Sequence, residues 1–405
     1  MFAATLLCIP ALLQACGPER RASTPLESPA PVSAAGRPTA DLEPAWATTT
    51  QSPAPVAASA DPVHAAFQAP CGANDRALEG AASAFAHALG QGEPTPEADE
   101  IALWLRRLGS PYVWPRAWAL EGPENEIMGG SPRLASWLET FGDGGERRCG
   151  VGSATANGRR VVAVVAVDVL ADLEPLPVRA HVGSWLSLGA TLLVPASAAK
   201  VVLLGPSGAP RTVPTSLQGQ RVSARFALER PGRFVIQVLA DVRGGPRPVV
   251  EALVFAGADP SSALGPEAAP GEEAAAGASN AAQAIERMLG VARRKEALPG
   301  LSRLEALDRI AQAHADAMRD SGRIGHDVGD GNPAARVAAA GILALSAGEN
   351  VAHAMSIIQA HRSLYASPSH RSNMLSPAFD SIGIGVAGDR DGTFWVCQLY
   401  ARVAP

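Results

Sequence analysis

The chain of 405 residues has few aromatic side chains and little charge: 5% of its residues are Phe, Trp or Tyr, and 18% are charged. Gly and Pro are abundant instead, with 40 and 34 residues. A chain of this length can bury two or three separate cores. The composition nevertheless predicts that some stretches are linkers and not packed domains.

The sequence also lacks a concentrated basic region. Its formal net charge is −5, and short Arg clusters are spread along the chain at 106–107, 147–148 and 293–294. Proteins that bind nucleic acids gather basic charge on one surface. We therefore expect these clusters to be solvated faces, and we expect no nucleic-acid partner.

The apolar run at the N-terminus, from Phe2 to Leu13, is too short to span a bilayer and has the length of the hydrophobic region of a secretory signal. No basic residue precedes it. Residues 13–17, Leu-Gln-Ala-Cys-Gly, resemble a bacterial lipobox. The resemblance implies a signal peptide over 1–17 and lipidation of Cys16, which would anchor the protein to a membrane. A plain secretory signal with a chance Cys is the alternative, and both interpretations predict an extracytoplasmic location.

The sequence contains only five cysteines, and two of them, Cys8 and Cys16, fall in the signal region. Cys71 and Cys149 bracket one predicted domain and could form a disulfide in an oxidising compartment. Cys397 lies in a strand-like apolar run, and nothing near it in the sequence would lower its pKa. We expect a buried thiol there and not a nucleophile.

Two biased segments divide the chain. Residues 18–69 are dominated by Pro, Ala, Ser and Thr and predict a disordered tether, and residues 258–279 predict a second linker. Between them, residues 175–257 contain short strand-like runs separated by Gly and Pro turns, which predicts an immunoglobulin-like β-sandwich.

Residues 280–405 carry helix-period apolar stripes followed by two alternating runs, 381–387 and 393–403, with a Gly-rich hairpin turn between them. A further helix is expected from about residue 350 to 365. Helices followed by a small antiparallel sheet predict an α+β sandwich.

Residues 71–170 repeat part of this pattern. Steps of four, three and four residues occur in both segments: Leu78, Ala82, Phe85 and Leu89 in the first, and Leu307, Ala311, His314 and Met318 in the second. The run 149–152 before 161–167 parallels the run 382–385 before 394–400, but no His occurs between His87 and His181. We interpret residues 71–170 as a degenerate copy of the C-terminal domain that kept its packing and lost its polar cleft. Chance similarity between two small helical segments is the alternative.

Three segments of the C-terminal block carry polar residues in a distinctive order: Gly-His at 325–326, Gly-Glu-Asn at 348–350, and Ser-Pro-Ser-His-Arg-Ser-Asn-Met-Leu at 367–375. With Leu-Pro-Gly-Leu at 298–301 and the run 379–386, they resemble bacterial proteins of the CAP superfamily, the SCP-like domains of cysteine-rich secretory, antigen 5 and pathogenesis-related 1 proteins. The resemblance covers about 125 residues and implies an α-β-α sandwich with a surface cleft.

The resemblance also implies the cleft residues. His326 and His370 take the positions of the two cleft histidines, and Glu349 that of the central acid. Ser367 stands where the eukaryotic pattern has a second Glu, so the set of two Glu and two His is incomplete. His314 lies on the apolar stripe of its helix, and we expect a packed His that borders the cleft.

Several chemistries remain open for these residues. Two imidazoles and a carboxylate could bind Zn²⁺ or another divalent cation, with His326 and His370 as ligands and Glu349 beside them. Glu349 could instead be a catalytic general base, or the cluster could be a structural hydrogen-bond network. The sequence has no Gly-x-Ser-x-Gly motif, so a hydrolase built on Ser367 and His370 is not expected. His353 and His361 are expected to lie exposed on the following helix.

Together these features predict an exported, lipid-anchored protein of the bacterial envelope that binds a lipid, a glycan or another protein. Binding is favoured over catalysis because the second acid is missing. Two alternatives stay open: a metal-dependent hydrolase of peptide or cell-wall material, and a structural envelope protein with a vestigial cleft.

Overall fold

The computed structural model describes residues 45–404 except 53–60, 97, 142–144, 157, 244 and 261–266. The predicted signal peptide, its lipidation site Cys16 and most of the predicted tether therefore lie outside the described residues. Within them, no helix is long and apolar enough to cross a membrane.

The predicted tether is wrong at its C-terminal end. Strand β1 (Thr49–Thr50) pairs with β7 (Leu176–Pro177), and helix α1 spans Pro62–Gln68. The Asp61 carboxylate caps α1 by accepting hydrogen bonds from the first-turn amides. Val63 and Phe67, four residues apart, enter a core together with Cys71. A single apolar pair suffices for this helix, although the segment has a linker-like composition.

The first domain contains a four-stranded sheet in the order β2-β4-β5-β3. The short β2 runs parallel to β4, and the other two pairs are antiparallel. The strands are β2 (Ala73–Asn74), β3 (Arg116–Gly122), β4 (Glu146–Ala156) and β5 (Arg159–Val169), and the helices are α2 (Arg76–Gly90), α3 (Ala98–Arg107), α4 (Glu124–Ile127) and α5 (Ser131–Leu138), with 3₁₀ turns at Ala69–Cys71 and Met128–Gly130.

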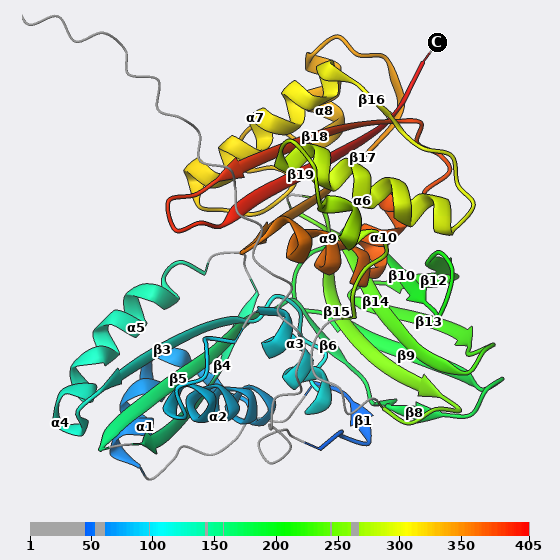
Figure 1. The fold of residues 1–405 in the computed structure, drawn as a ribbon. Coiled ribbons are helices and arrows are strands. Elements are labelled where there is room, and N and C mark those ends of the chain that lie inside the picture. Colours follow the sequence, from blue (N-terminus) through cyan, green and yellow to red (C-terminus); the bar gives the residue numbers. More distant parts are fainter. Residues whose placement is uncertain are drawn as a thin grey trace, which may run out of the picture. The chain divides into compact units, whose positions relative to one another are not determined.

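Strand β5 explains the layering of this domain, because its apolar run is buried on both faces. Val161, Val165 and their alternate neighbours pack with α2 and α3. Val162 and Val164 face the opposite core, which contains α1 and α5. The result is a sheet with helices on both sides (Figure 1).

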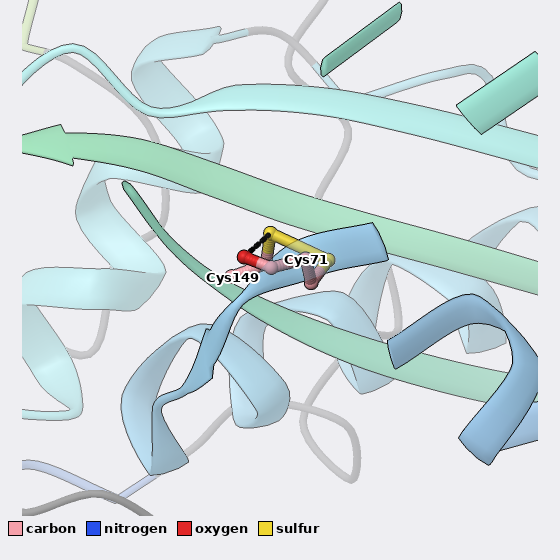
Figure 2. The surroundings of a disulfide bond; sticks show 2 residues. All are labelled: Cys71 and Cys149. Carbon is pink, nitrogen blue, oxygen red and sulfur yellow. Dashed lines mark hydrogen bonds between the residues drawn. A yellow bond between two sulfur atoms is a disulfide. The ribbon is translucent and has the colours of Figure 1, made fainter. Parts of the chain in front are cut away.

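A disulfide joins Cys71 to Cys149, with 5.5 Å between their Cα atoms. Figure 2 shows this bond beside the strand that carries Cys149. Both cysteines are buried, and the bond connects the start of the domain to β4. It therefore closes the segment that the two cysteines bracket in the sequence.

The second domain is built from two packed sheets, ordered β11-β10-β14-β15-β8 and β12-β13-β9-β6. Along β13 the side chains of Val222, Ala224 and Phe226 are buried, while their neighbours face solvent. The strands are β6 (Ala171–Leu173), β8 (Arg179–Ala180), β9 (Trp185–Leu192), β10 (Ala198–Leu204), β11 (Arg211–Val213), β12 (Thr215–Gln218), β13 (Arg221–Ala227), β14 (Gly232–Val242) and β15 (Gly245–Ala256).

The C-terminal domain has a second four-stranded sheet, ordered β16-β18-β19-β17. The short β16 is parallel to β18, and the other pairs are antiparallel, as in the first domain. The strands are β16 (Ser302–Arg303), β17 (Ala344–Ala354), β18 (Ser381–Gly388) and β19 (Phe394–Val403), and the helices are α6 (Ala281–Lys295), α7 (Glu305–Ser321), α8 (Pro333–Ala339), α9 (Ile357–Ala366) and α10 (Pro368–Met374).

Helices cover both faces of this sheet (Figure 1). Helix α7 packs on one face through Leu307, Ala311 and Ala315, and α6, α9 and α10 pack on the other. The domain is therefore the expected α-β-α sandwich.

Two expectations about the boundaries of this domain are wrong. Residues 350–354 belong to strand β17 and not to a helix, and α9 begins only after Ser356, whose hydroxyl caps it. The predicted linker ends earlier than residue 279: Ala269 is buried in the core, and the 3₁₀ turn Glu272–Ala275 is held by an ion pair between Glu272 and Arg362.

Glycines allow the central strands to approach their helices. A Cβ at Gly383 or Gly385 would lie 2.2 Å from backbone atoms of Leu307 or Ala311 in α7. A Cβ at Gly150 or Gly152 would lie 1.9 Å or 2.2 Å from backbone atoms of α2. Only glycine fits such a contact without moving the helix.

Candidate functional site

The side chain of Glu349 is the centre of a buried polar cluster. It lies on β17 and is 4% exposed. His326 donates from Nδ1 to Oε1 over 2.9 Å, and His314 Nε2 lies 3.6 Å from the same oxygen. The other oxygen, Oε2, accepts from Arg336 Nη2 and, over 3.3 Å, from the thiol of Cys397. Both carboxylate oxygens therefore already have protein partners.

Arg336 is the residue of this cluster that sequence reasoning missed. It lies on α8, its side chain is 8% exposed, and it forms ion pairs with Glu349 and Asp330. Its Nη1 also donates to the carbonyls of His326 over 3.1 Å and Gly331 over 2.7 Å. The available signal in the sequence was that Arg336 lies one turn into the helix that Asn332 caps. Nothing in the sequence placed that helix next to Glu349.

His314 is fully buried and is held on both sides of its ring. Nδ1 lies 2.7 Å from an oxygen of Asp330, and Nε2 donates to the carbonyl of Gly325 over 2.9 Å. Burial alone would raise the pKa of Asp330, but its hydrogen bond with His314 and the charges around it bring the pKa below the usual value. These contacts make His314 a structural support for the loop that carries His326.

His326 joins the cluster through Glu349, whereas the centroid of the His370 ring lies 6.4 Å from that of the Trp114 ring. The His326 side chain is 24% exposed, and Glu349 fixes its ring by accepting the Nδ1 proton. When the ring is neutral, its lone pair is on Nε2. Burial, and then the nearby charge of His326, lower the pKa of His370 to about 3. His370 can therefore present a neutral imidazole nitrogen at neutral pH.

A network of amides fixes the backbone around His370 on α10. Asn350 Nδ2 donates to the His370 carbonyl over 3.1 Å. Asn373 donates from Nδ2 to the Glu349 carbonyl over 3.1 Å and to Asn350 Oδ1 over 3.0 Å. This network joins α10 to β17, so the two motifs that contain Glu349 and His370 are fixed to one another.

The remaining candidates have other roles. The hydroxyl of Ser367 faces Ser369 at 3.4 Å and Gln237 at 3.5 Å, and has no contact with the Glu349 cluster. His353 is exposed as expected but lies on β17, where its ring stacks on Trp395. His361 is buried, against expectation, because its Nε2 donates to the Pro270 carbonyl in the segment expected to be a linker.

The chemistry of the cluster is limited by these contacts. Burial, and then the charge of Glu349, raise the pKa of Cys397 well above its usual value, so the thiol is no nucleophile. Among the residues that the structure describes, no group of three or more His, Cys, Asp or Glu side chains is arranged to hold a metal ion.

Comparison with known proteins gives a family match for part of the C-terminal domain. Residues 287–399 match the model of the CAP, or cysteine-rich secretory protein, family. An outer surface protein of Borrelia burgdorferi is 19% identical, with 29% of this chain and 87% of that chain covered and a TM-score of 0.28. An extracellular SCP-domain protein of Bacillus anthracis is 18% identical, with coverages of 57% and 88% and a TM-score of 0.28.

A cysteine-rich secretory protein of Staphylococcus aureus is 11% identical, with coverages of 66% and 89% and a TM-score of 0.27. No curated protein matches the chain significantly. The matched range contains His326, Glu349 and His370. The C-terminal part of the chain, over residues 287–399, is therefore a CAP domain of the cysteine-rich secretory protein family.

Proposed function

We propose that the protein is an exported binding protein of the bacterial envelope, and that its CAP domain binds a divalent cation such as Zn²⁺ between His326 and His370. The observation that carries this proposal is the pairing of His326 Nδ1 with the buried carboxylate of Glu349. Histidines that ligate metals usually donate their other ring nitrogen to such a group. The low pKa of His370 supports the same role, because a neutral imidazole is the ligating form.

The contacts of Glu349 favour binding over hydrolysis. A general base needs a free lone pair within reach of a water molecule. Arg336, His326 and the Cys397 thiol already occupy both oxygens of Glu349. The bound ion would supply open coordination positions for an oxygen atom of an envelope glycan, lipid or protein, and Glu349 would hold His326 in orientation.

Calorimetric titration of the full chain with Zn²⁺ tests the cation site. The double variant His326→Ala/His370→Ala should lose binding, while His181→Ala, an exposed His of the second domain, should bind as the wild type does. Glu349→Gln should weaken affinity by about 10-fold to 100-fold, because it no longer fixes His326 as strongly. Equal Zn²⁺ binding by the wild type and the double variant would remove the proposal.

The hydrolase alternative predicts a different result. Turnover of peptide or cell-wall fragments should collapse in Glu349→Gln while the protein stays folded. If such turnover is found, Glu349 is a base and the binding proposal is wrong. If His326→Ala, His370→Ala and Glu349→Gln all leave ligand binding intact, the cleft is not the ligand site.

The disulfide between Cys71 and Cys149 supports an extracytoplasmic location, because such bonds persist in oxidising compartments. We propose that lipidation of Cys16 anchors the protein to the membrane. Fractionation of cells producing Cys16→Ser tests this, and the protein should move from the membrane to the soluble fraction. Retention of the variant on membranes would show that another feature holds it there.

We also propose that the first domain is a degenerate copy of the CAP domain and that the second is an immunoglobulin-like sandwich. The common strand order of the two four-stranded sheets and their paired glycine contacts support the duplication. The two packed sheets, antiparallel except for the short pairing of β8 with β15, support the sandwich. A structure of each isolated domain would test both assignments.

A further inference from the structure

The strand registers identify which residues of the first domain correspond to the polar cluster. In the C-terminal sheet, Gly383 lies opposite Leu399, which lies opposite Glu349. In the first sheet, Gly150 lies opposite Val165, which lies opposite Ala117. Ala117 on β3 therefore takes the place of Glu349 on β17.

The helices give the matching correspondence. Gly383 contacts the backbone at Leu307 of α7, and Gly150 contacts it at Leu78 of α2. Seven residues further along each helix lie His314 and Phe85. The acid and the buried His of the CAP domain are thus replaced by an alanine and a phenylalanine.

A cavity of about 590 Å³ lies at this position in the first domain. Its walls include Phe85 and Leu89 from α2, Ile101 from α3, and Ala117 and Ala119 from β3. In the CAP domain, the corresponding position next to Glu349 is filled by the side chains of Arg336 and His326. In place of the polar side chains, the first domain has a recess lined by these apolar side chains and also by Thr95, Arg116 and Glu121.

The cavity runs along the edge of a sheet. Among the described residues β3 pairs only with β5 and forms the end of the sheet order, and the cavity is lined along Arg116–Glu121. On an antiparallel edge strand, every second residue points its N–H and C=O groups away from the sheet. A hydrocarbon ligand would cover these groups without pairing them, which costs free energy. An extended peptide would pair with them and place alternate side chains in the recess.

We propose that this cavity binds an extended peptide segment that adds to β3 as a further strand and inserts apolar side chains between α2, α3 and β3. The small side chains of Ala117 and Ala119 leave the room for those insertions. The residues that line this site do not include His326 or His370, so the proposal does not depend on the function proposed for them.

Fluorescence anisotropy with a labelled, capped Lys-Val-Thr-Val-Thr-Val-Lys peptide and the full chain tests the proposal. Two further peptides carry N-methyl groups on alternate residues, so that each blocks one hydrogen-bonding edge. We expect the unmodified peptide to bind and one of the two methylated peptides to bind at least tenfold more weakly. Hydrogen exchange should slow at the amides of β3 when peptide is added.

Ala119→Phe fills the recess and should weaken binding at least tenfold, whereas Ala198→Phe, at an exposed position on β10, should not. If Ala119→Phe does not fold, the methylated peptides and the hydrogen exchange of the wild-type chain still test the proposal. Cis-parinaric acid is the hydrocarbon probe. Failure of the peptide to bind, equal binding of all three peptides, or binding of cis-parinaric acid that the peptide does not displace would overturn the proposal.

Discussion

The guanidinium group of Arg336 neutralises a carboxylate that the fold has removed from water. Glu349 is almost completely buried, and Arg336 is the arginine that pairs with it. A buried ion pair contributes little in net terms, but removal of one partner leaves a buried charge without compensation. The cluster should therefore tolerate the presence of both partners or the replacement of both, and should be destabilised when only one is replaced.

Arg336→Met should lower the free energy of unfolding by about 3–5 kcal/mol, measured by urea denaturation. Arg319→Met is the matched control: Arg319 forms ion pairs with Asp316 and Asp320 on the surface, and its loss should change little. The double variant Arg336→Met/Glu349→Gln should be more stable than the two single losses added together predict. Additive losses would mean that the two side chains do not interact.

The low pKa of His370 should make stability depend on pH in one direction. In the unfolded chain a His titrates near pH 6.5, whereas in the fold burial and the charge of His326 lower the pKa of His370 to about 3. Below about pH 6.5 the unfolded state gains a proton that the folded state does not, so stability falls with decreasing pH, by at most about 1.4 kcal/mol per pH unit.

Urea denaturation of wild type and His370→Asn between about pH 7.5 and 4 checks this. The range extends to low pH because the pKa of His370 is lowered in the fold. The variant should show a shallower decrease below about pH 6.5, and the two proteins should differ by a constant amount above it. His181→Asn, at an exposed position, should keep the full decrease. Identical slopes for wild type and His370→Asn would contradict the burial of this ring.

The order of short motifs was enough to predict that His326 and Glu349 lie together. Each lies next to a Gly, Asn or Ser-Pro signal that the sequence displays. Asp330 and Arg336 could not be found in this way, because their roles come from the position of α8 above β17. Ser367 was placed by motif alone, and in the structure its hydroxyl faces away from the cluster.

At the scale of elements, close contact between strand and helix governs both four-stranded sheets. Gly385→Ala should destabilise the CAP domain by about 1–3 kcal/mol or more, since its Cβ would meet the α7 backbone at 2.2 Å. Gly388→Ala on the same strand is the control, because nothing lies within 4 Å of its Cβ position. Thermal unfolding of the two variants measures the difference, and equal melting temperatures would show that α7 can move aside.

Strand β17 shows where local pattern fails. Residues 344–354 contain four Ala and a single β-branched residue, so they carry little strand propensity of their own. Their conformation comes from pairing with β19. Strand β5 is the opposite case, since its continuous Val and Ala run predicts a strand buried on both faces.

At the scale of the whole molecule, composition was a poor guide to boundaries. The segments before residue 71 and before residue 279 look like linkers, yet each ends in a short element held by a few contacts: Phe67 in one core and Ala269 in another. Such contacts depend on partners far away in the sequence. The points where these elements begin could not be predicted from composition.

The disulfide should stabilise the first domain by restricting its unfolded chain. It joins residues 78 positions apart, and a loop of this length corresponds to about 4 kcal/mol. Cys71→Ser/Cys149→Ser should lose a stabilisation of this size in urea denaturation. Dithiothreitol should weaken the wild type by a similar amount and leave the double variant unchanged, whereas a response of the variant would implicate another bond.

The chain between α7 and β17 supplies His326, Asp330 and Arg336 from one continuous stretch of 22 residues, 322–343. Its counterpart between α2 and β3, residues 91–115, joins the same two kinds of element in the first domain. Under the proposed duplication, these two connections are the replaceable parts of a common scaffold, and one of them carries the polar residues. Residues 322–343 and 91–115 could be exchanged between the two domains, together with the matching residue on each helix and edge strand. Such an exchange would transfer the recognition surface of one domain to the other.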